Sequence, residues 1–133
     1  MLRMTPNLTV RADIKVVVVT DEGGAKDKSF NQANVEAIQA WTKANGAKEP
    51  VVLETKTQSD LTSNLQNAAK VSDIISLAGY EFEKEIPKVA EQYKDKKFMY
   101  VDTFVDAPNI ASLIFKEQEA GYLAGYIAAL QSK

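Results

Sequence analysis

Apolar and polar residues alternate along the chain in a way that predicts strands and helices in turn. The first apolar run, Asp13 to Thr20, is continuous, as in a strand buried on both faces of a parallel sheet. Further short runs predict strands at residues 50–55, 73–78, 97–102 and 110–115. Strand–helix units of this length form a parallel sheet with right-handed crossovers. The expected fold is an α/β, flavodoxin-like three-layer sandwich with a mostly parallel five-stranded sheet in the order 2-1-3-4-5.

Apolar residues at helical spacing predict four helices between and after these strands. Ser29 is the expected N-cap of the first helix, which ends at Asn45-Gly46. Pro87 fits the third helix only within its first turn. The residues predicted to face the core are Ala33, Ala37, Ala40, Trp41 and Ala44 in the first helix, Leu61, Leu65, Ala68 and Ala69 in the second, Phe82, Ile86, Val89 and Tyr93 in the third, and Ala120, Leu123, Ala124, Ile127 and Leu130 in the final helix, Glu117 to Lys133.

The length of 133 residues suits one domain with a single core. Residues 1–12 are expected to form a leader outside the fold, and residues 13–133 a single α/β lobe. The leader has no apolar stretch of signal-peptide length and no lipobox cysteine, so an export signal is expected to be absent from this chain. No apolar run approaches the ~20 residues that span a bilayer.

The composition is that of an ordinary soluble globular protein, with 45% hydrophobic and 26% charged residues. The formal net charge of -2, with mixed signs, predicts neither nucleic acid nor an anionic membrane as a partner. The sequence has no Cys, which excludes disulfides, thiolate metal sites and cysteine nucleophiles. It has no His, the usual general base and commonest metal ligand. These absences argue against an enzyme, and no cofactor is expected.

The expected binding site lies where the first, third and fourth strands end, because open α/β sheets bind ligands outside the carboxyl ends of their strands. The most informative stretch runs from Thr20 to Gln32, between the first strand and the first helix. The candidate site residues are Asp21, Phe30, Asn31, Gly79, Tyr80 and Asp102. Carboxylates, aromatic rings and a carboxamide suit a neutral, hydrogen-bonding ligand with a ring better than a phosphate.

Other chemistries fit this edge less well. A phosphate-binding loop would need a Gly-Lys-Ser/Thr run, whereas Gly23-Gly24 is flanked by acids. A dinucleotide fingerprint is absent, and a phosphorelay receiver would need an aspartate where the third strand ends in Leu77-Ala78-Gly79. Two alternatives stay open. The acids of the first turn could hold a divalent cation, or Asp21 and Asp102 could form a glycosidase-like carboxylate pair.

The candidate residues also have structural interpretations. Phe30, in the first turn of a helix, could be a core residue, and Asn31 could be an ordinary hydrogen-bonding residue of that turn. Asp102 could cap the loop backbone, and Tyr80 could be a surface ring. Trp41 fits the apolar face of its helix and is expected in the core.

Two motifs follow one another along the chain. The first is Asp27-Lys28-Ser29-Phe30-Asn31-Gln32, preceded by Thr20-Asp21 and a glycine-containing turn. The second is the segment from Asn109 to Gly125. Both resemble the basic membrane protein family, the substrate-binding lipoproteins of bacterial ABC importers best known as purine-nucleoside receptors with a type I periplasmic-binding fold. Gly79-Tyr80 and Tyr100-Val101-Asp102 fall at that family's strand ends.

The resemblance implies a role for each candidate residue. Phe30 would stack on a nucleobase, while Asn31 and Asp21 would form hydrogen bonds with it. Asp102 and the Gly79-Tyr80 turn would line the same cleft. The resemblance also implies a purine nucleoside as ligand, an ABC permease as partner, and an extracytoplasmic location, as a membrane-anchored lipoprotein or in the periplasm.

Receptors of this family have two lobes, so the chain is expected to supply one half of an interlobe cleft. The second aromatic ring and the ribose-binding residues would lie in the other lobe, so we expect this chain to bind nucleosides weakly or not at all. Its final helix would need another surface for its apolar residues, either its own sheet or a second copy in a homodimer. The alternative function is a flavodoxin-like structural or interaction module that binds no ligand.

Overall fold

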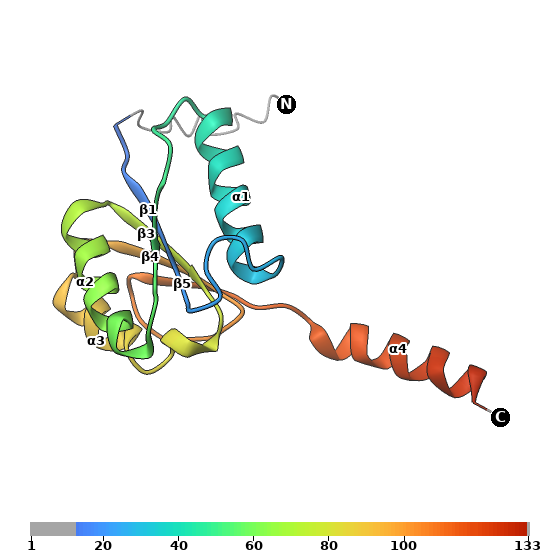
Figure 1. The fold of residues 1–133 in the computed structure, drawn as a ribbon. Coiled ribbons are helices and arrows are strands. Elements are labelled where there is room, and N and C mark those ends of the chain that lie inside the picture. The colour runs from blue at the N-terminus through green and yellow to red at the C-terminus, as the bar shows by residue number, and fades with distance from the viewer. Residues whose placement is uncertain (1–12, 133) are drawn as a thin grey trace, which may run out of the picture.

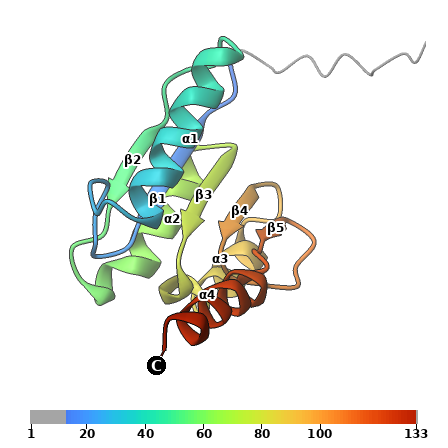
Figure 2. The ribbon, with the colours of Figure 1, turned by 90° about the vertical axis from the view of Figure 1, so that its right-hand side faces the viewer.

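The computed structural model describes residues 13–132, so the leader expected at residues 1–12 and the final residue lie outside the described residues. The strands are β1 (Val16–Thr20), β2 (Val51–Glu54), β3 (Ile74–Ala78), β4 (Lys97–Val101) and β5 (Ile110–Leu113). They form one five-stranded sheet in the order β2-β1-β3-β4-β5, which Figure 2 shows side by side. Every neighbouring pair is parallel. The predicted α/β class and strand order are confirmed.

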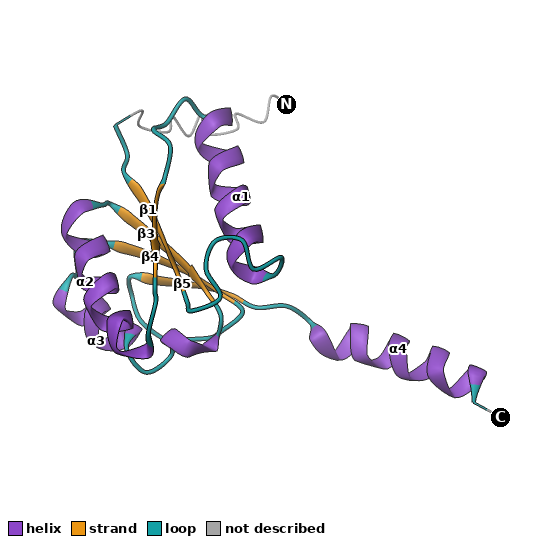
Figure 3. Cartoon of the chain, viewed as in Figure 1, coloured by secondary structure: helices purple, strands orange, loops and turns teal. Residues whose placement is uncertain are grey.

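Helices cover both faces of the sheet (Figures 1 and 3). α1 (Phe30–Ala44) lies on one face, against β1 and β3. α2 (Leu61–Val71) and α3 (Ile86–Gln92) pack side by side on the other face. The main hydrophobic core lies on this second side, where the predicted residues Leu61, Leu65, Ala68, Ala69, Phe82, Ile86 and Val89 are buried. Pro87 lies in the first turn of α3, as its ring requires.

α1 buries a different face from the predicted one. Its buried residues are Asn31, Asn34, Val35 and Thr42, whereas the predicted Ala33, Ala37, Ala40, Trp41 and Ala44 are exposed. The hydroxyl of Ser76 in β3 donates a hydrogen bond to Asn34 Oδ1 at 2.7 Å. The sheet therefore has a buried polar group, the Ser76 hydroxyl, on the face that α1 covers. The polar side of α1 packs there because Asn34 accepts the hydrogen bond of this hydroxyl. The prediction from the apolar spacing of α1 was wrong, and Trp41 is not a core residue.

The last helix stands apart from the sheet. α4 (Glu117–Gln131) extends away from the other elements (Figure 1), and none of its residues is buried. The predicted inward face, Ala120, Leu123, Ala124, Ile127 and Leu130, is therefore exposed, and that prediction was wrong. Tyr122 and Tyr126 add apolar surface on another side of the helix, so the apolar pattern does not indicate one face that would pack on the sheet. Among the described residues, no helix combines the length and apolar character needed to cross a membrane.

Candidate functional site

The parallel strands bring the predicted site segments to one edge of the sheet. β1 pairs with β3, and β3 pairs with β4, so these three strands end next to one another. The loop at residues 21–29, the turn at 79–82 and the loop at 102–109 begin at these ends. The candidate residues therefore come from three segments that are distant in sequence and adjacent in space, as the carboxyl edge of an open α/β sheet requires.

Asp21 and Asn31 are joined directly. Asn31 Nδ2 donates to Asp21 Oδ1 at 2.6 Å, and the backbone N–H of Gly23 donates to the same oxygen at 2.8 Å. Asn31 Oδ1 in turn accepts from the backbone N–H of Asp21 at 3.4 Å. Asn31 is only 2% exposed, so its carboxamide is used inside the protein. This geometry holds one oxygen of Asp21 in place and leaves the other for a different partner.

Asp27, rather than the predicted Ser29, caps the start of α1. Ser29 is the N-cap residue by position, but its side chain makes no capping hydrogen bond. The Asp27 carboxylate accepts from the backbone N–H groups of Ser29, Asn31 and Gln32 at 2.8, 3.2 and 3.0 Å, and from Asn31 Nδ2 at 3.0 Å. Burial alone would raise the pKa of Asp27, but these hydrogen bonds outweigh it and hold the pKa below its ordinary value. An aspartate just ahead of a helix was the sequence signal for this cap.

Gly79 lets the turn after β3 approach Asp21 closely. A Cβ atom added at Gly79 would lie 3.3 Å from Asp21 Oδ2. Its backbone has φ 92° and ψ 153°, a region that is essentially restricted to glycine. The turn is fixed on both sides, because the Gly79 N–H donates to the Val101 carbonyl at 3.2 Å and the Tyr100 hydroxyl donates to the Gly79 carbonyl at 2.9 Å. The second oxygen of Asp21 therefore faces this turn.

Replacing Gly79 with alanine is expected to lower the free energy of unfolding by about 2–3 kcal/mol, because it adds backbone strain and a close contact with Asp21. Gly46→Ala is the matched control. Gly46 also has a positive φ, 65°, but a Cβ atom there would meet nothing within 4 Å. The control should lose only about 1 kcal/mol. Urea unfolding of both variants measures the difference, and equal losses would contradict the close approach of Gly79 to Asp21.

Three aromatic rings near this edge are exposed to solvent. Phe30, the first residue of α1, is 47% exposed, and Tyr80 is 76% exposed. Phe30 is therefore not a core residue. Phe104, in the loop after β4, is 66% exposed and was missed by the sequence reasoning, which treated residues 103–109 only as a break in the pattern. Exposed rings of this kind offer flat apolar surfaces for stacking.

Asp102 sits in an uncommon backbone conformation directly after β4. Its φ is 70°, in the left-handed region that L-residues other than glycine adopt infrequently. Its backbone N–H donates to the Leu113 carbonyl at 2.7 Å, which ties the end of β4 to the end of β5. Strained residues of this kind collect at binding and active sites, where the surrounding structure holds them. Because Ala78 pairs with Val101 in the sheet, Asp102 lies at the same edge of the sheet as Gly79.

Glu81 is a further acid at this edge that the sequence reasoning missed. It lies in the short 3-10 helix Tyr80–Phe82 after β3, and its Oε2 atom is buried without a hydrogen-bond partner among the described residues. Burial raises the pKa of Glu81, and the charges of Asp21 and Glu22 raise it further. Its only sequence signal was its place beside the Gly-Tyr turn.

The arrangement can bind a ligand through stacking and through carboxylate acceptors. Asp21 Oδ2 has no hydrogen-bond partner within residues 13–132 and can accept hydrogen bonds from N–H or O–H groups, whereas Glu81 Oε2 also lacks a partner there but is buried. In the described part of the chain, no group of three or more acidic side chains is placed to hold a metal ion. The edge thus presents exposed aromatic rings and a carboxylate oxygen without a partner among the described residues.

The sequence has clear relatives among known proteins. The sequence profile of the family described as "ABC transporter substrate-binding protein PnrA-like" matches residues 14–133. The chain is 35% identical over 127 residues to the CD4+ T-cell-stimulating antigen of Listeria monocytogenes, covering 91% of this chain and 36% of that protein. It is 31% identical over 129 residues to the ABC transporter nucleoside-binding protein BmpA of Lactococcus lactis subsp. cremoris, covering 93% and 37%. The chain spans about a third of the length of these relatives.

Solved structures share the fold. A solute-binding protein of an ABC transporter system from Aeropyrum pernix K1 matches 87% of this chain with a TM-score of 0.75 and 32% identity, over 32% of its own length. A protein fragment from Peptoclostridium difficile 630 matches 90% of this chain with a TM-score of 0.69, over 100% of its own length. Its identity is 24%, so this second likeness concerns the fold alone.

Proposed function

The chain belongs to the family of PnrA-like substrate-binding proteins of ABC transporters, and we propose that it forms one face of a cleft that binds a nucleoside, with a purine base as the expected ligand. The resemblance seen in the sequence motifs is thus confirmed at the level of the family. The family description names substrate-binding proteins, which supports a solute-binding role.

The fixed position of the Asp21 carboxylate is the main support for this proposal. Asp21 is held by Asn31 and by the Gly23 N–H through one oxygen, while its other oxygen faces the Gly79 turn. A fixed acceptor near the exposed Phe30 ring matches a base that stacks through its face and donates from its edge. The relative from Lactococcus lactis, named as a nucleoside-binding protein, supports the same ligand class.

We assign the candidate residues separate roles in this cleft. Phe30 stacks on the base and Asp21 accepts a hydrogen bond from it. Asp102 and the Gly79-Tyr80 turn line the cleft. Asn31 acts as a positioning residue, because its buried carboxamide is already bonded to Asp21 and Asp27. This role differs from the direct base contact that the family resemblance implies.

We further propose that the chain acts outside the cytoplasm beside an ABC permease. Relatives include proteins described as lipoproteins, and the family description names ABC transporters, which supports a membrane-anchored or periplasmic setting. The edge formed by Asp21, Gly79 and Asp102 is the part of this chain that would face the solute.

A titration followed by NMR tests the nucleoside proposal. A single face offers about 1–3 kcal/mol from stacking and about 1.5–3 kcal/mol from a charged hydrogen bond, before the cost of association. We therefore expect inosine or adenosine to bind the 133-residue chain with a dissociation constant on the order of 1 mM or weaker. The amide signals of Gly23, Phe30, Gly79 and Asp102 should shift.

Phe30→Ala should abolish these shifts. Tyr126→Ala is the control, because this ring is also exposed, at 57%, but lies on α4. It should leave the shifts unchanged. Tight binding by calorimetry would contradict the half-cleft, and shifts that survive Phe30→Ala would contradict the stacking role.

The alternative function is an interaction module without ligand binding, and the exposure of α4 favours it. The large apolar residues of α4 are exposed by 57% to 72%: Tyr122, Leu123, Tyr126, Ile127 and Leu130. We propose that this helix associates with a second copy of the chain when no other protein surface covers it. No shift at the sheet edge with any nucleoside, together with stable self-association, would favour this alternative.

A further inference from the structure

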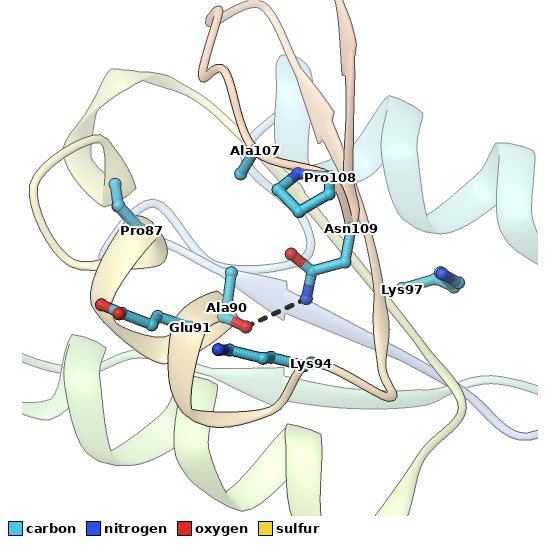
Figure 4. Close-up of a pocket in the computed structure, with 8 residues that line it drawn as sticks. All are labelled: Pro87, Ala90, Glu91, Lys94, Lys97, Ala107, Pro108 and Asn109. Carbon is cyan, nitrogen blue, oxygen red and sulfur yellow. Dashed lines mark hydrogen bonds between the residues drawn. The ribbon is translucent and has the colours of Figure 1, made fainter.

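A pocket lies at the opposite edge of the sheet from the proposed nucleoside site. It has a volume of about 410 Å³ and lies between α3 and the segment before β5 (Figure 4). Its lining residues are Pro87, Ala90, Glu91, Lys94, Lys97, Ala107, Pro108 and Asn109. Half of these residues are alanine or proline, whose small side chains leave the space unfilled. The volume falls in the lower part of the range for small-molecule sites, about 300–1,000 Å³.

Asn109 places a hydrogen-bond acceptor in this pocket. The residue is 8% exposed, and its Nδ2 donates to the carbonyls of Ala90, Tyr93 and Lys96 at 3.0, 3.2 and 3.2 Å. Turning the carboxamide over would set its oxygen against these carbonyl oxygens, so the orientation is determined. Oδ1 therefore points away from them, toward the space beside Pro108 in Figure 4, and has no protein partner within the described residues.

The charged side chains around the pocket favour an anionic group at its mouth. Lys94 and Lys97 line the pocket, and neither forms an ion pair with another residue of the described chain. Glu91 is the one acid in the lining, so the formal balance is one positive charge. An ammonium group without a partner pairs readily with a carboxylate that approaches from solvent.

We propose that this pocket binds a small organic carboxylate that has an apolar body and one N–H donor, the chemistry of an N-acylated amino acid. The apolar body contacts Pro87, Ala107 and Pro108. The N–H group donates to Asn109 Oδ1, and the carboxylate pairs with Lys94 or Lys97. Because the pocket lies at the amino ends of β4 and β5, it is separate from the nucleoside edge and stays accessible when that edge is covered.

NMR titration of the 133-residue chain with N-acetyl-L-leucine tests this site. We expect the side-chain amide signal of Asn109 and the backbone signals of Ala107 and Ala90 to shift at ligand concentrations up to about 10 mM. Lys94→Gln with Lys97→Gln should weaken binding about fivefold, because each exposed ion pair contributes modestly. Lys88→Gln is the matched control, since Lys88 lies on α3, pairs with Glu85 at 3.4 Å and does not line the pocket.

Two analogues separate the contributions of the ligand groups. N-acetyl-L-leucinamide lacks the carboxylate and should bind about as weakly to the native chain as the acid binds to the double lysine variant. The ester analogue, in which oxygen replaces the N–H group, should bind several-fold more weakly and lose the Asn109 shift. The proposal is overturned if no signal shifts at about 10 mM, if the ester binds as well as the amide, or if Lys88→Gln weakens binding as much as the double variant.

Discussion

Asn31→Asp is expected to destabilise the chain by about 3 kcal/mol or more at pH 7, because it adds a third carboxylate to a site that already holds two. Asn31 Nδ2 lies 2.6 Å from Asp21 Oδ1 and 3.0 Å from Asp27 Oδ2. The substitution replaces this shared donor with an acceptor in a position that is 2% exposed. The loop after β1 then keeps its folded conformation only if a carboxyl group takes up a proton, and otherwise it opens.

The destabilisation should depend on pH in a defined direction. The neighbouring carboxylates raise the folded-state pKa of the introduced carboxyl above its unfolded value. Its protonated form is therefore compatible with folding at low pH, and stability is lost as pH rises through the raised pKa. Asp27 behaves in the opposite way, since its lowered pKa makes its contribution fully present above the unfolded pKa and lost as pH falls through the folded pKa. The stability difference between native chain and variant should thus shrink from pH 7 to about pH 5.

Urea unfolding at both pH values measures this effect. Asn45→Asp is the matched control, because it introduces the same charge at an exposed residue at the other end of α1. Asn45 Nδ2 donates to the Trp41 carbonyl at 2.8 Å, so the control should lose about 1 kcal/mol, and this loss should change little with pH. A loss of similar size and pH dependence in both variants would show that Asn31 does not bridge Asp21 and Asp27.

The strands and their order followed from the sequence because they depend on strong, local patterns. The continuous apolar run of β1 is buried throughout, as predicted, and the alternation of strands with helices allows few topologies. The positions of Asp21, Gly79 and Asp102 at strand ends followed in turn, since parallel strands end at a common edge. These predictions required only the spacing of apolar residues along the chain and the rules for connecting parallel strands through helices.

The details of the proposed site depend on contacts between distant residues, which a pattern does not reveal. The hydrogen bonds that bury Asn31 come from the loop folding back through Asp21 and Asp27. On the inner face of α1, Asn34 accepts a hydrogen bond from Ser76 of β3, which lies 42 positions away in the chain. A prediction from apolar periodicity expects the buried face of a helix to be apolar. For α1 it therefore predicted burial of the wrong face. The cap by Asp27 was missed for a different reason: Ser29 stands at the usual N-cap position, and Asp27 binds the helix start from two residues earlier.

α4 is the element whose surroundings the sequence least determines. A helix that is apolar on all sides is normally buried, and an isolated helix of about 15 residues is only marginally stable in water. Its Tyr122 and Tyr126 rings stack within the helix, with centroids 6.4 Å apart, but the remaining apolar side chains meet no other element. The exposed apolar side chains and the marginal stability of an isolated helix both favour association. A partner would cover the apolar surface and would also stabilise the helical backbone.

We expect the 133-residue chain to form a dimer through α4 at micromolar concentrations, with helix content rising as the dimer forms. Leu123→Glu with Ile127→Glu should weaken the dimer by about two orders of magnitude or more, because burying each large apolar side chain contributes about 1.5–3 kcal/mol. Gln118→Glu with Gln131→Glu is the control, since it adds the same two charges to α4 while keeping every apolar side chain. Analytical ultracentrifugation and circular dichroism across a concentration series measure both quantities. A native chain that stays monomeric with α4 fully helical would rule out this association, whereas a dimer unaffected by the Leu123 and Ile127 substitutions would place the interface elsewhere.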